Sequence, residues 1–244
     1  MRFFLLPFCI TLLFTSVAQA SDKAHWGYTG TVGPKNWQNL SPKFSVCGGE
    51  NQSPVNLTGF IEAELTPLKL SYNEGGKEIT NNGHSVQVNY SPGSTLFIGN
   101  ESFELKQFHF HSPSENHING KSYPFESHFV HVNKDGKIAV VSVLYNEGEE
   151  NKALAEFWSQ LPERQHETKK LKKAVNAALL LPDNKDYYYF NGSLTTPPCT
   201  EGVRWFVFKE ALSISKEQLD TFSSVMPQKN NRPLQPKNAR PILK

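Results

Sequence analysis

The sequence predicts a mainly β, single-domain α+β fold, with a large, mostly antiparallel, twisted central sheet and short helices at its periphery. Short alternating or aromatic-rich runs bounded by Gly, Asn and Pro recur along the chain and outnumber the segments with helical periodicity. No internal repeat, low-complexity linker or change of composition divides the chain. One domain built around strands is the simplest interpretation.

The first twenty residues are excluded from the fold. Arg2 precedes an apolar run that ends in Ala18-Gln19-Ala20, the pattern of a secretory signal peptide cleaved before Ser21. The run is shorter than the roughly 20 apolar residues that span a bilayer. We expect a signal peptide at 1–20, one domain at 21–244, and a secreted protein.

The expected strands and helices follow in chain order. Strands are predicted at 68–72, 85–90, 95–98, 102–111, 125–132, 138–145 and 203–208. Helical periodicity is limited to 152–161, 168–180 and 216–226. Ser215, with Gln218 three residues later, forms a capping box before the last helix. The lysines within 168–180 are expected on a solvated helix face.

The charge and the cysteines limit the partners and the compartment. A formal net charge of +2 at pH 7 favours neither a nucleic-acid nor a membrane partner. Cys9 leaves with the signal peptide, so Cys47 and Cys199 are the remaining pair in an exported protein. Because exported chains seldom keep free thiols, we interpret this pair as a disulfide.

Histidines gather on two of the predicted strands. Alternation within 104–111 sends Gln107, His109 and His111 to one face of the strand and the phenylalanines to the other. In the strand that follows, Glu126 and His128 share a face and His131 points away. Antiparallel pairing of the two strands can bring three imidazoles together.

Three neutral imidazoles with an open fourth position are typical of catalytic zinc sites. Gln107 and Glu126 lie on the same faces and can hold the other ring nitrogens of the histidines. The alternative interpretation is a set of ordinary polar-face histidines, which a lone His-x-His pattern favours.

The chain resembles the α-class carbonic anhydrases along nearly its whole length after the signal peptide. The matching segments, in order, are His25-Trp26-Gly27-Tyr28, Asn51-Gln52-Ser53-Pro54-Val55-Asn56, Asn81-Asn82-Gly83-His84, the two histidine strands, Ser193-Leu194-Thr195-Thr196-Pro197-Pro198 and Arg232-Pro233-Leu234-Gln235-Pro236. Departures are modest: Ser112 replaces a tryptophan of many animal members, and Gln87 stands where asparagine is common.

The resemblance implies a zinc enzyme, a lyase that reversibly hydrates carbon dioxide to bicarbonate and a proton by attack of zinc-bound hydroxide. It implies zinc ligands His109, His111 and His128, supported by Gln107 and Glu126. Thr195 would accept a hydrogen bond from the hydroxide and donate its own to Glu115, which aims the nucleophile. His84 would carry the proton to bulk water.

The resemblance also assigns the walls of the pocket and the disulfide. Residues implied for substrate are Val130, Val140, Leu194, Thr195, Thr196, Val203 and Trp205, and those implied for the wet side are Tyr28, Asn82 and Gln87. The Cys47–Cys199 bridge would pin the threonine loop, as in exported bacterial members. Sulfonamide and anion inhibitors are expected at the zinc, and the sequence leaves a homodimer open.

Two alternative functions are a cupin-type metal enzyme and a non-catalytic binding module of the same fold. His109-x-His111-x-x-x-Glu115 has the spacing of a cupin metal motif, but the glycine expected seven residues after the glutamate stands at Gly120 instead. A non-catalytic module of the same fold would have lost a ligand histidine, and all three are present. Asn-x-Ser/Thr sites such as Asn191-Gly192-Ser193 favour a bacterial periplasm over a glycosylating pathway.

Overall fold

The computed structural model describes residues 24–244. The predicted signal peptide at 1–20 therefore lies outside the described residues. Within 24–244, no helix is both long enough and apolar enough to traverse a bilayer.

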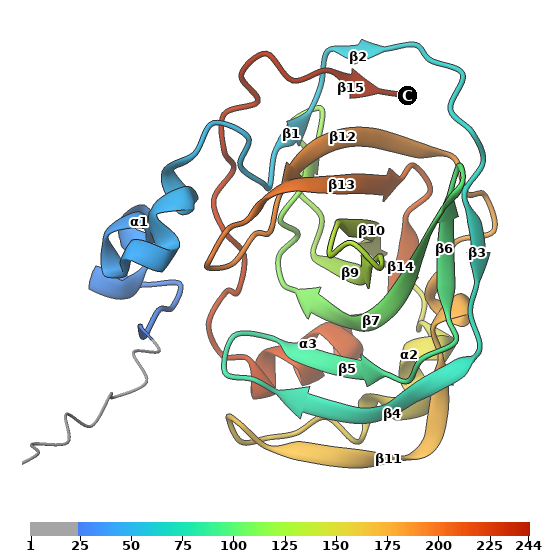
Figure 1. The fold of residues 1–244 in the computed structure, drawn as a ribbon. Coiled ribbons are helices and arrows are strands. Elements are labelled where there is room, and N and C mark those ends of the chain that lie inside the picture. Colours follow the sequence, from blue (N-terminus) through green and yellow to red (C-terminus); the bar gives the residue numbers. More distant parts are fainter. Residues whose placement is uncertain (1–23) are drawn as a thin grey trace, which may run out of the picture.

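A large twisted sheet dominates the molecule (Figure 1). Its main path runs β11-β4-β5-β7-β9-β10-β13-β12-β15-β2, with β3, β6 and β14 attached beside it. Most pairs are antiparallel, and β10–β13, β10–β14 and β15–β2 are parallel. The predicted fold class is confirmed.

The bounds of the strands, including the separate pair β1–β8, are as follows. They are β1 (Asn56–Leu57), β2 (Phe60–Ile61), β3 (Lys69–Ser71), β4 (Glu74–Asn81), β5 (Val86–Tyr90), β6 (Thr95–Ile98), β7 (Glu101–His111), β8 (His117–Ile118), β9 (Phe125–Val132), β10 (Ile138–Glu147), β11 (Thr168–Asn176), β12 (Tyr187–Ser193), β13 (Glu201–Phe208), β14 (Leu212–Ile214) and β15 (Ile242–Leu243). Every predicted strand is present, and β4, β11 and β12 are the longer ones that the sequence analysis did not predict.

Short helices lie at the periphery. They are the 3₁₀ helices η1 (Gly30–Val32), η2 (Pro34–Asn36), η3 (Pro42–Gly48) and η4 (Ala177–Leu180), and the α-helices α1 (Trp37–Leu40), α2 (Lys152–Trp158) and α3 (Lys216–Val225). The capping box of Ser215 and Gln218 is confirmed at the start of α3.

The predicted helix at 168–180 is wrong. Residues 168–176 form β11, an edge strand that pairs with β4, and only Ala177–Leu180 is helical, as η4. Lys170, Lys172 and Lys173 are exposed along the strand. Charged side chains of this kind protect an edge strand from pairing with another chain.

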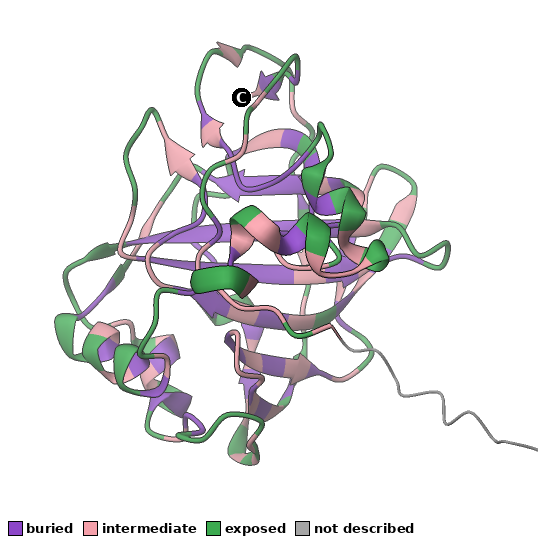
Figure 2. Cartoon of the chain, turned by 90° about the vertical axis from the view of Figure 1, so that its left-hand side faces the viewer, coloured by how far each residue is buried: buried purple, intermediate pink, exposed green. Residues whose placement is uncertain are grey.

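The sheet separates two apolar clusters. Long stretches of its strands are buried, drawn in purple in Figure 2. The phenylalanines of β7 and β9 face the larger cluster, where α2 and α3 cover them with Phe157, Trp158 and Phe222. The smaller cluster lies on the face that also carries the histidines, and it includes Val140, Val203 and Trp205. The histidines therefore stand beside a buried apolar wall.

Candidate metal centre

Strand pairing places three histidines side by side. β7 and β9 are antiparallel, and their register sets His109 opposite His128 and His111 opposite Glu126. The phenylalanines between them point into the core, so the polar side chains share the other face.

His131, on the same strand as His128, points to the opposite face as predicted. It is buried, and its Nδ1–H donates to the carbonyl of Ala139 at 3.3 Å while its Nε2 accepts from the Tyr72 hydroxyl at 2.6 Å. Both ring nitrogens are thus satisfied, and His131 has none left for a metal.

Each of the three clustered histidines has one nitrogen committed to an acceptor. His109 Nδ1 donates to Gln107 Oε1 at 2.8 Å, His111 Nδ1 donates to the Asn230 carbonyl at 2.7 Å, and His128 Nε2 donates to Glu126 Oε1 at 2.8 Å. These oxygens only accept, so the ring nitrogens bonded to them carry the protons. The free lone pairs are then on His109 Nε2, His111 Nε2 and His128 Nδ1.

The free nitrogens converge on one point. The ligand atoms of His109, His111 and His128 lie within 4.8 Å of one another. His111 Nε2 is buried without a hydrogen-bond partner, as expected of a nitrogen that holds a metal rather than a protein group. The three residues therefore fit a tetrahedral metal ion with one open position.

Burial favours the neutral form of two of these imidazoles, His109 and His111. Desolvation lowers the pKa of His109 well below its usual value, with the charges of His111 and His128 acting in the same direction. Burial also lowers the pKa of His111. Neutral imidazole is the form that binds a metal.

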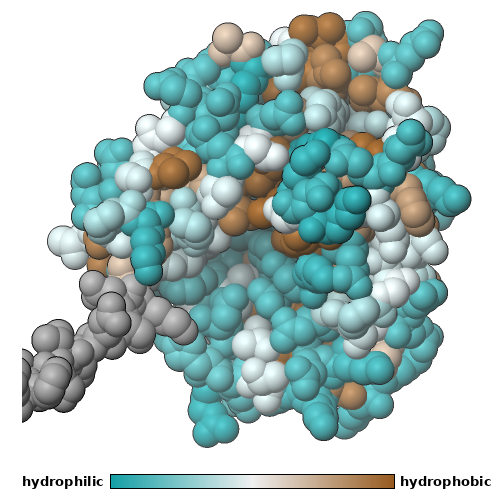
Figure 3. Space-filling model, viewed as in Figure 1, coloured by the Kyte–Doolittle hydropathy of each residue, from teal (hydrophilic) through white to brown (hydrophobic). Residues whose placement is uncertain are grey.

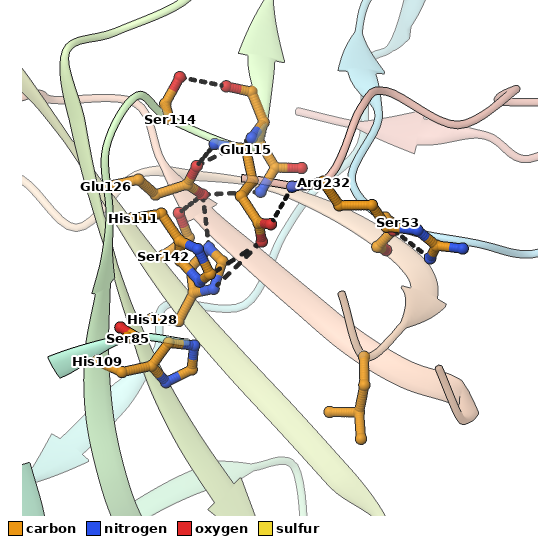
Figure 4. Close-up of polar contacts among 12 residues, drawn as sticks. Ser53, Ser85, His109, His111, Ser114, Glu115, Glu126, His128, Ser142 and Arg232 are labelled. Atoms are coloured by element: carbon orange, nitrogen blue, oxygen red, sulfur yellow. Dashed lines mark hydrogen bonds and ion pairs between the residues drawn. The ribbon is translucent and has the colours of Figure 1, made fainter. Parts of the chain in front are cut away.

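Glu126 anchors the site from behind. Its carboxylate accepts hydrogen bonds from the backbone N–H groups of Glu115 and Asn116, from Asn116 Nδ2, and from the hydroxyl of Ser142 (Figure 4). Burial raises the pKa of Glu126, but the charge and the hydrogen bond of His128, with those other donors, outweigh it and hold the pKa at about 2. An ionised carboxylate thus fixes the ring of His128.

The Glu115 carboxylate points at the ligand set (Figure 4). Its Oε1 accepts from the Arg232 backbone N–H at 2.8 Å, and its Oε2 lies 3.5 Å from His111 Nε2 and 3.9 Å from His128 Nδ1. Burial raises the pKa of Glu115 to about 7, although His128, Arg232 and the Thr195 hydroxyl each lower it. The Thr195 hydroxyl is close enough to affect this carboxylate. Among the described residues, however, Glu115 Oε2 has no hydrogen-bond partner of standard geometry.

The loop that carries Thr195 is held at both ends. Cys199 is disulfide-bonded to Cys47, which confirms the predicted pair. Before the loop, Ser53 and Ser193 exchange hydrogen bonds between backbone N–H and hydroxyl at 2.9 and 3.1 Å. Gln52 Nε2 donates to the carbonyl of Cys199. The buried Thr195 lies between these two anchors.

The predicted apolar wall is brought together in one cluster. Val140, Val203 and Trp205 are buried in it, and Val130 and Leu194 are half-buried against it. The ring of Trp205 stands edge-on to His128 at 4.9 Å between centroids. Thr196 is half-buried in the adjoining loop. The space-filling view shows a hollow on this face, with hydrophobic side chains above it and hydrophilic ones below (Figure 3).

The residues predicted for the wet side, Tyr28, Asn82 and Gln87, carry polar groups. Gln87 pairs across the strands with His109 and donates to Asn89 at 2.6 Å. Asn82 Oδ1 accepts from the backbone N–H groups of His84 and Ser85, which shapes their turn. The Tyr28 hydroxyl is buried, and its pKa is raised well above its usual value by burial and by the charge of Glu115.

His84 is half-buried in that turn and stacks on Trp26, with ring centroids 3.6 Å apart and 9° between planes. Burial lowers the pKa of His84, and charges on His25 and His166 lower it further. The stacking on Trp26 fixes the orientation of the ring, which remains partly exposed to solvent.

Sequence reasoning missed three groups that support the site. Asn230 holds His111 through a main-chain carbonyl, which carries no side-chain signature. Ser142 reaches Glu126 from β10, and register alone could have shown it, because Ser142 pairs with His128. Arg232 is buried and donates to Gln52, Ser53 and the carbonyl of Cys47.

Comparisons with known proteins give a consistent result. The family model described as eukaryotic-type carbonic anhydrase matches residues 32–244. A carbonic anhydrase of Pectobacterium carotovorum is 49% identical over 227 residues, covering 93% of each chain. The α-carbonic anhydrase of Thermovibrio ammonificans, solved with the inhibitor sulfanilamide, has a TM-score of 0.89 at 47% identity, covering 91% of this chain and 99% of that one. A hyperthermostable carbonic anhydrase from a hydrothermal vent chimney has a TM-score of 0.88 at 50% identity, covering 90% and 99%.

Proposed function

The chain belongs to the eukaryotic-type, or α, carbonic anhydrase family and is an enzyme of reversible carbon dioxide hydration, and we propose that His109, His111 and His128 hold its zinc ion. One observation carries the proposal. Each imidazole has one nitrogen bonded to an acceptor, and the remaining three nitrogens lie within 4.8 Å of one another. Glu115 stays outside the ligand set as a hydrogen-bond acceptor, which argues against a cupin-type site.

When bound, zinc would lower the pKa of a coordinated water to about 7, the value established for carbonic anhydrases, and would so supply hydroxide as the nucleophile. The protein residues then orient the reaction. The Thr195 hydroxyl, once it donates to the Glu115 carboxylate, can only accept from the attacking oxygen. This aims an oxygen lone pair at the substrate carbon.

The apolar wall of the hollow binds the substrate, and the opposite, polar side serves proton removal. Val130, Val140, Leu194, Val203 and Trp205 offer carbon dioxide an apolar surface, which excludes water from the carbon under attack. Thr196 orients bicarbonate. Asn82 and Gln87 place polar groups on the opposite side, although the Tyr28 hydroxyl predicted there is buried. His84 carries the released proton to bulk water.

The proposed zinc centre also explains inhibitor binding, and the disulfide indicates the compartment of the protein. The relative solved with sulfanilamide supports binding of sulfonamides at the zinc. The Cys47–Cys199 disulfide and the bacterial relatives support export to a bacterial periplasm.

The experiment compares zinc content and stopped-flow carbon dioxide hydration in the wild type, His128→Ala and His131→Gln. His128→Ala should lose most of its zinc and its activity while remaining folded by circular dichroism, because two imidazoles make a poor tetrahedral site. His131→Gln is the matched control, since it changes a buried histidine of the same strand that faces away. Full zinc occupancy with wild-type hydration in His128→Ala would overturn the assignment.

A further inference from the structure

Two histidines outside the proposed site share a cavity with His84. His25, His84 and His166 line a cavity of about 350 Å³ between the N-terminal segment, the turn before β5 and the turn before β11. Nothing in the chemistry described above uses His25 or His166.

The backbone holds His166 against the turn of His84. His166 has a left-handed conformation with φ 64°, and its N–H donates to the Asn81 carbonyl at 2.6 Å. The Asn81 N–H in turn donates to the Glu167 carbonyl at 3.0 Å. These two bonds tie the turn before β11 to the end of β4, where the Asn82–Ser85 turn begins.

The ring of His166 lies over Gly83, directly beside His84. A Cβ atom at Gly83 would stand 3.3 Å from His166 Cε1 and 3.6 Å from its Nε2. The absence of a side chain at Gly83 thus lets the imidazole approach the His84 turn closely. Gly83 itself has φ 84°, which favours glycine there.

The two histidines differ in exposure. His84 is half-buried under Trp26, whereas His166 is exposed. The charged groups around His166 are His84 and His25 across the cavity and Arg164 and Glu167 on its own turn, which lie 3.7 Å apart as an ion pair. The end of α3 contributes neutral residues, Val225 and Met226. An exposed imidazole therefore lines the same cavity as His84.

We propose that His166 is a second proton carrier, which takes the proton of His84 through cavity water and passes it to buffer. The charge of His166 already affects His84, since it is one cause of the lowered pKa of His84. A neutral His166 gains the proton at its unprotonated ring nitrogen as His84 loses it. The resulting imidazolium then gives one proton to a buffer base, so both residues end neutral. The inference rests on the proposed role of His84.

The test measures kcat and kcat/KM for carbon dioxide hydration in dilute buffer, with His166→Asn as the main variant, because asparagine tolerates the left-handed backbone. We expect kcat to fall about threefold, within the roughly 100-fold that a positioned acid–base group contributes. The value of kcat/KM should not change, and added imidazole should restore kcat. His117→Asn, at a half-buried position of β8, is the control and should match the wild type.

Two further variants separate a carrier from other roles. His166→Lys keeps a positive charge but does not exchange protons at neutral pH, so it should lose as much kcat as His166→Asn. In a His84→Ala background, His166→Asn should cause no further loss. Wild-type kcat in His166→Asn or in His166→Lys, or an equal loss in the His84→Ala background, overturns the inference alone. Wild-type kcat in His84→Ala overturns the role of His84 and this inference with it.

Discussion

At the scale of single residues, the acceptor bonded to each imidazole decides which nitrogen is free. Gln107 holds Nδ1 of His109 and leaves Nε2, whereas Glu126 holds Nε2 of His128 and leaves Nδ1. The proposed ligand set is therefore two Nε2 atoms and one Nδ1 atom. The supporting acceptors are as important for geometry as the histidines themselves.

Gln107→Ala should weaken zinc binding by about 10- to 100-fold, because His109 loses the bond that fixes its tautomer and ring orientation. The fold should be kept, since Gln107 is half-buried on the solvated side of β7. Gln107→Glu, which keeps the acceptor, is the control and should stay near wild-type affinity. Chelator competition gives the dissociation constants, and equal values for Gln107→Ala and the wild type would contradict the proposed support.

His84→Ala and Thr195→Ala should differ in kinetics. Loss of the carrier lowers kcat after the chemical step and leaves kcat/KM nearly unchanged, with rescue by imidazole buffer. Loss of Thr195 removes the group that aims the nucleophile, so kcat/KM should fall too and buffer should not restore it. Stopped-flow hydration across buffer concentrations makes the comparison, and one shared kinetic pattern would refute the separate roles.

Alternation along two strands was sufficient to predict the histidine cluster and to exclude His131. Alternation was not sufficient to predict the acceptor that holds His111. The carbonyl of Asn230 comes from the segment after α3, more than a hundred residues away along the chain, and any residue type has a carbonyl. Main-chain contacts of this kind require the folded structure.

At the scale of elements, the disulfide and Arg232 join three segments around the threonine loop. Cys199 has φ 58°, a left-handed conformation that is uncommon for residues other than glycine. Arg232 donates to the carbonyl of Cys47, and Gln52 donates to that of Cys199, so both halves of the bridge are held.

Reduction of the bridge, or the double change Cys47→Ser and Cys199→Ser, should lower thermal stability. A bridge across 152 residues stabilises by about 5 kcal/mol in the chain-entropy model. This corresponds to a fall in Tm of about 10 °C. Differential scanning calorimetry measures it, with thiol titration of the unfolded, unreduced protein as the control; free thiols there would contradict the bridge in solution.

In β11, the sequence pattern predicts a helix where the structure has a strand. Its segment continues into Ala177 and Leu180 with helix-forming residues, and the lysines fit a solvated helix face equally well. In the structure β4 supplies a pairing partner, and tertiary pairing overrides local helix preference. The helix predicted at 152–161 had no such competing partner, and α2 forms within that range at Lys152–Trp158.

At the scale of the whole molecule, one sheet separates a dry core from a reactive face. Helices α2 and α3 cover the aromatic side, and the other side carries the three clustered histidines, the proposed metal ligands, beside an apolar wall. His131 places an imidazole, a group that is protonated in mild acid when exposed, on the dry side. There it stacks on Tyr72 with ring centroids 5.7 Å apart.

The position of His131 predicts an acid-sensitive fold. Burial lowers its pKa from 6.5 to about 4, although the carbonyl of Ala139 opposes the shift. The unfolded chain thus binds a proton more readily than the folded one between these values. This stability is fully present above pH 6.5 and is lost as pH falls towards 4, by about 3 kcal/mol.

The test compares urea unfolding of the wild type and His131→Gln from pH 7.5 to pH 4. Glutamine keeps polar groups for Tyr72 and Ala139 but does not titrate, so the variant should be less stable at pH 7.5 and lose less stability on acidification. Buried carboxyl groups, such as Glu115 and Glu126, are common to both proteins, so their contributions cancel in the difference. The gap in unfolding free energy should therefore narrow by about 3 kcal/mol across the window. A gap that stays constant with pH would mean that His131 does not resist protonation in the folded protein.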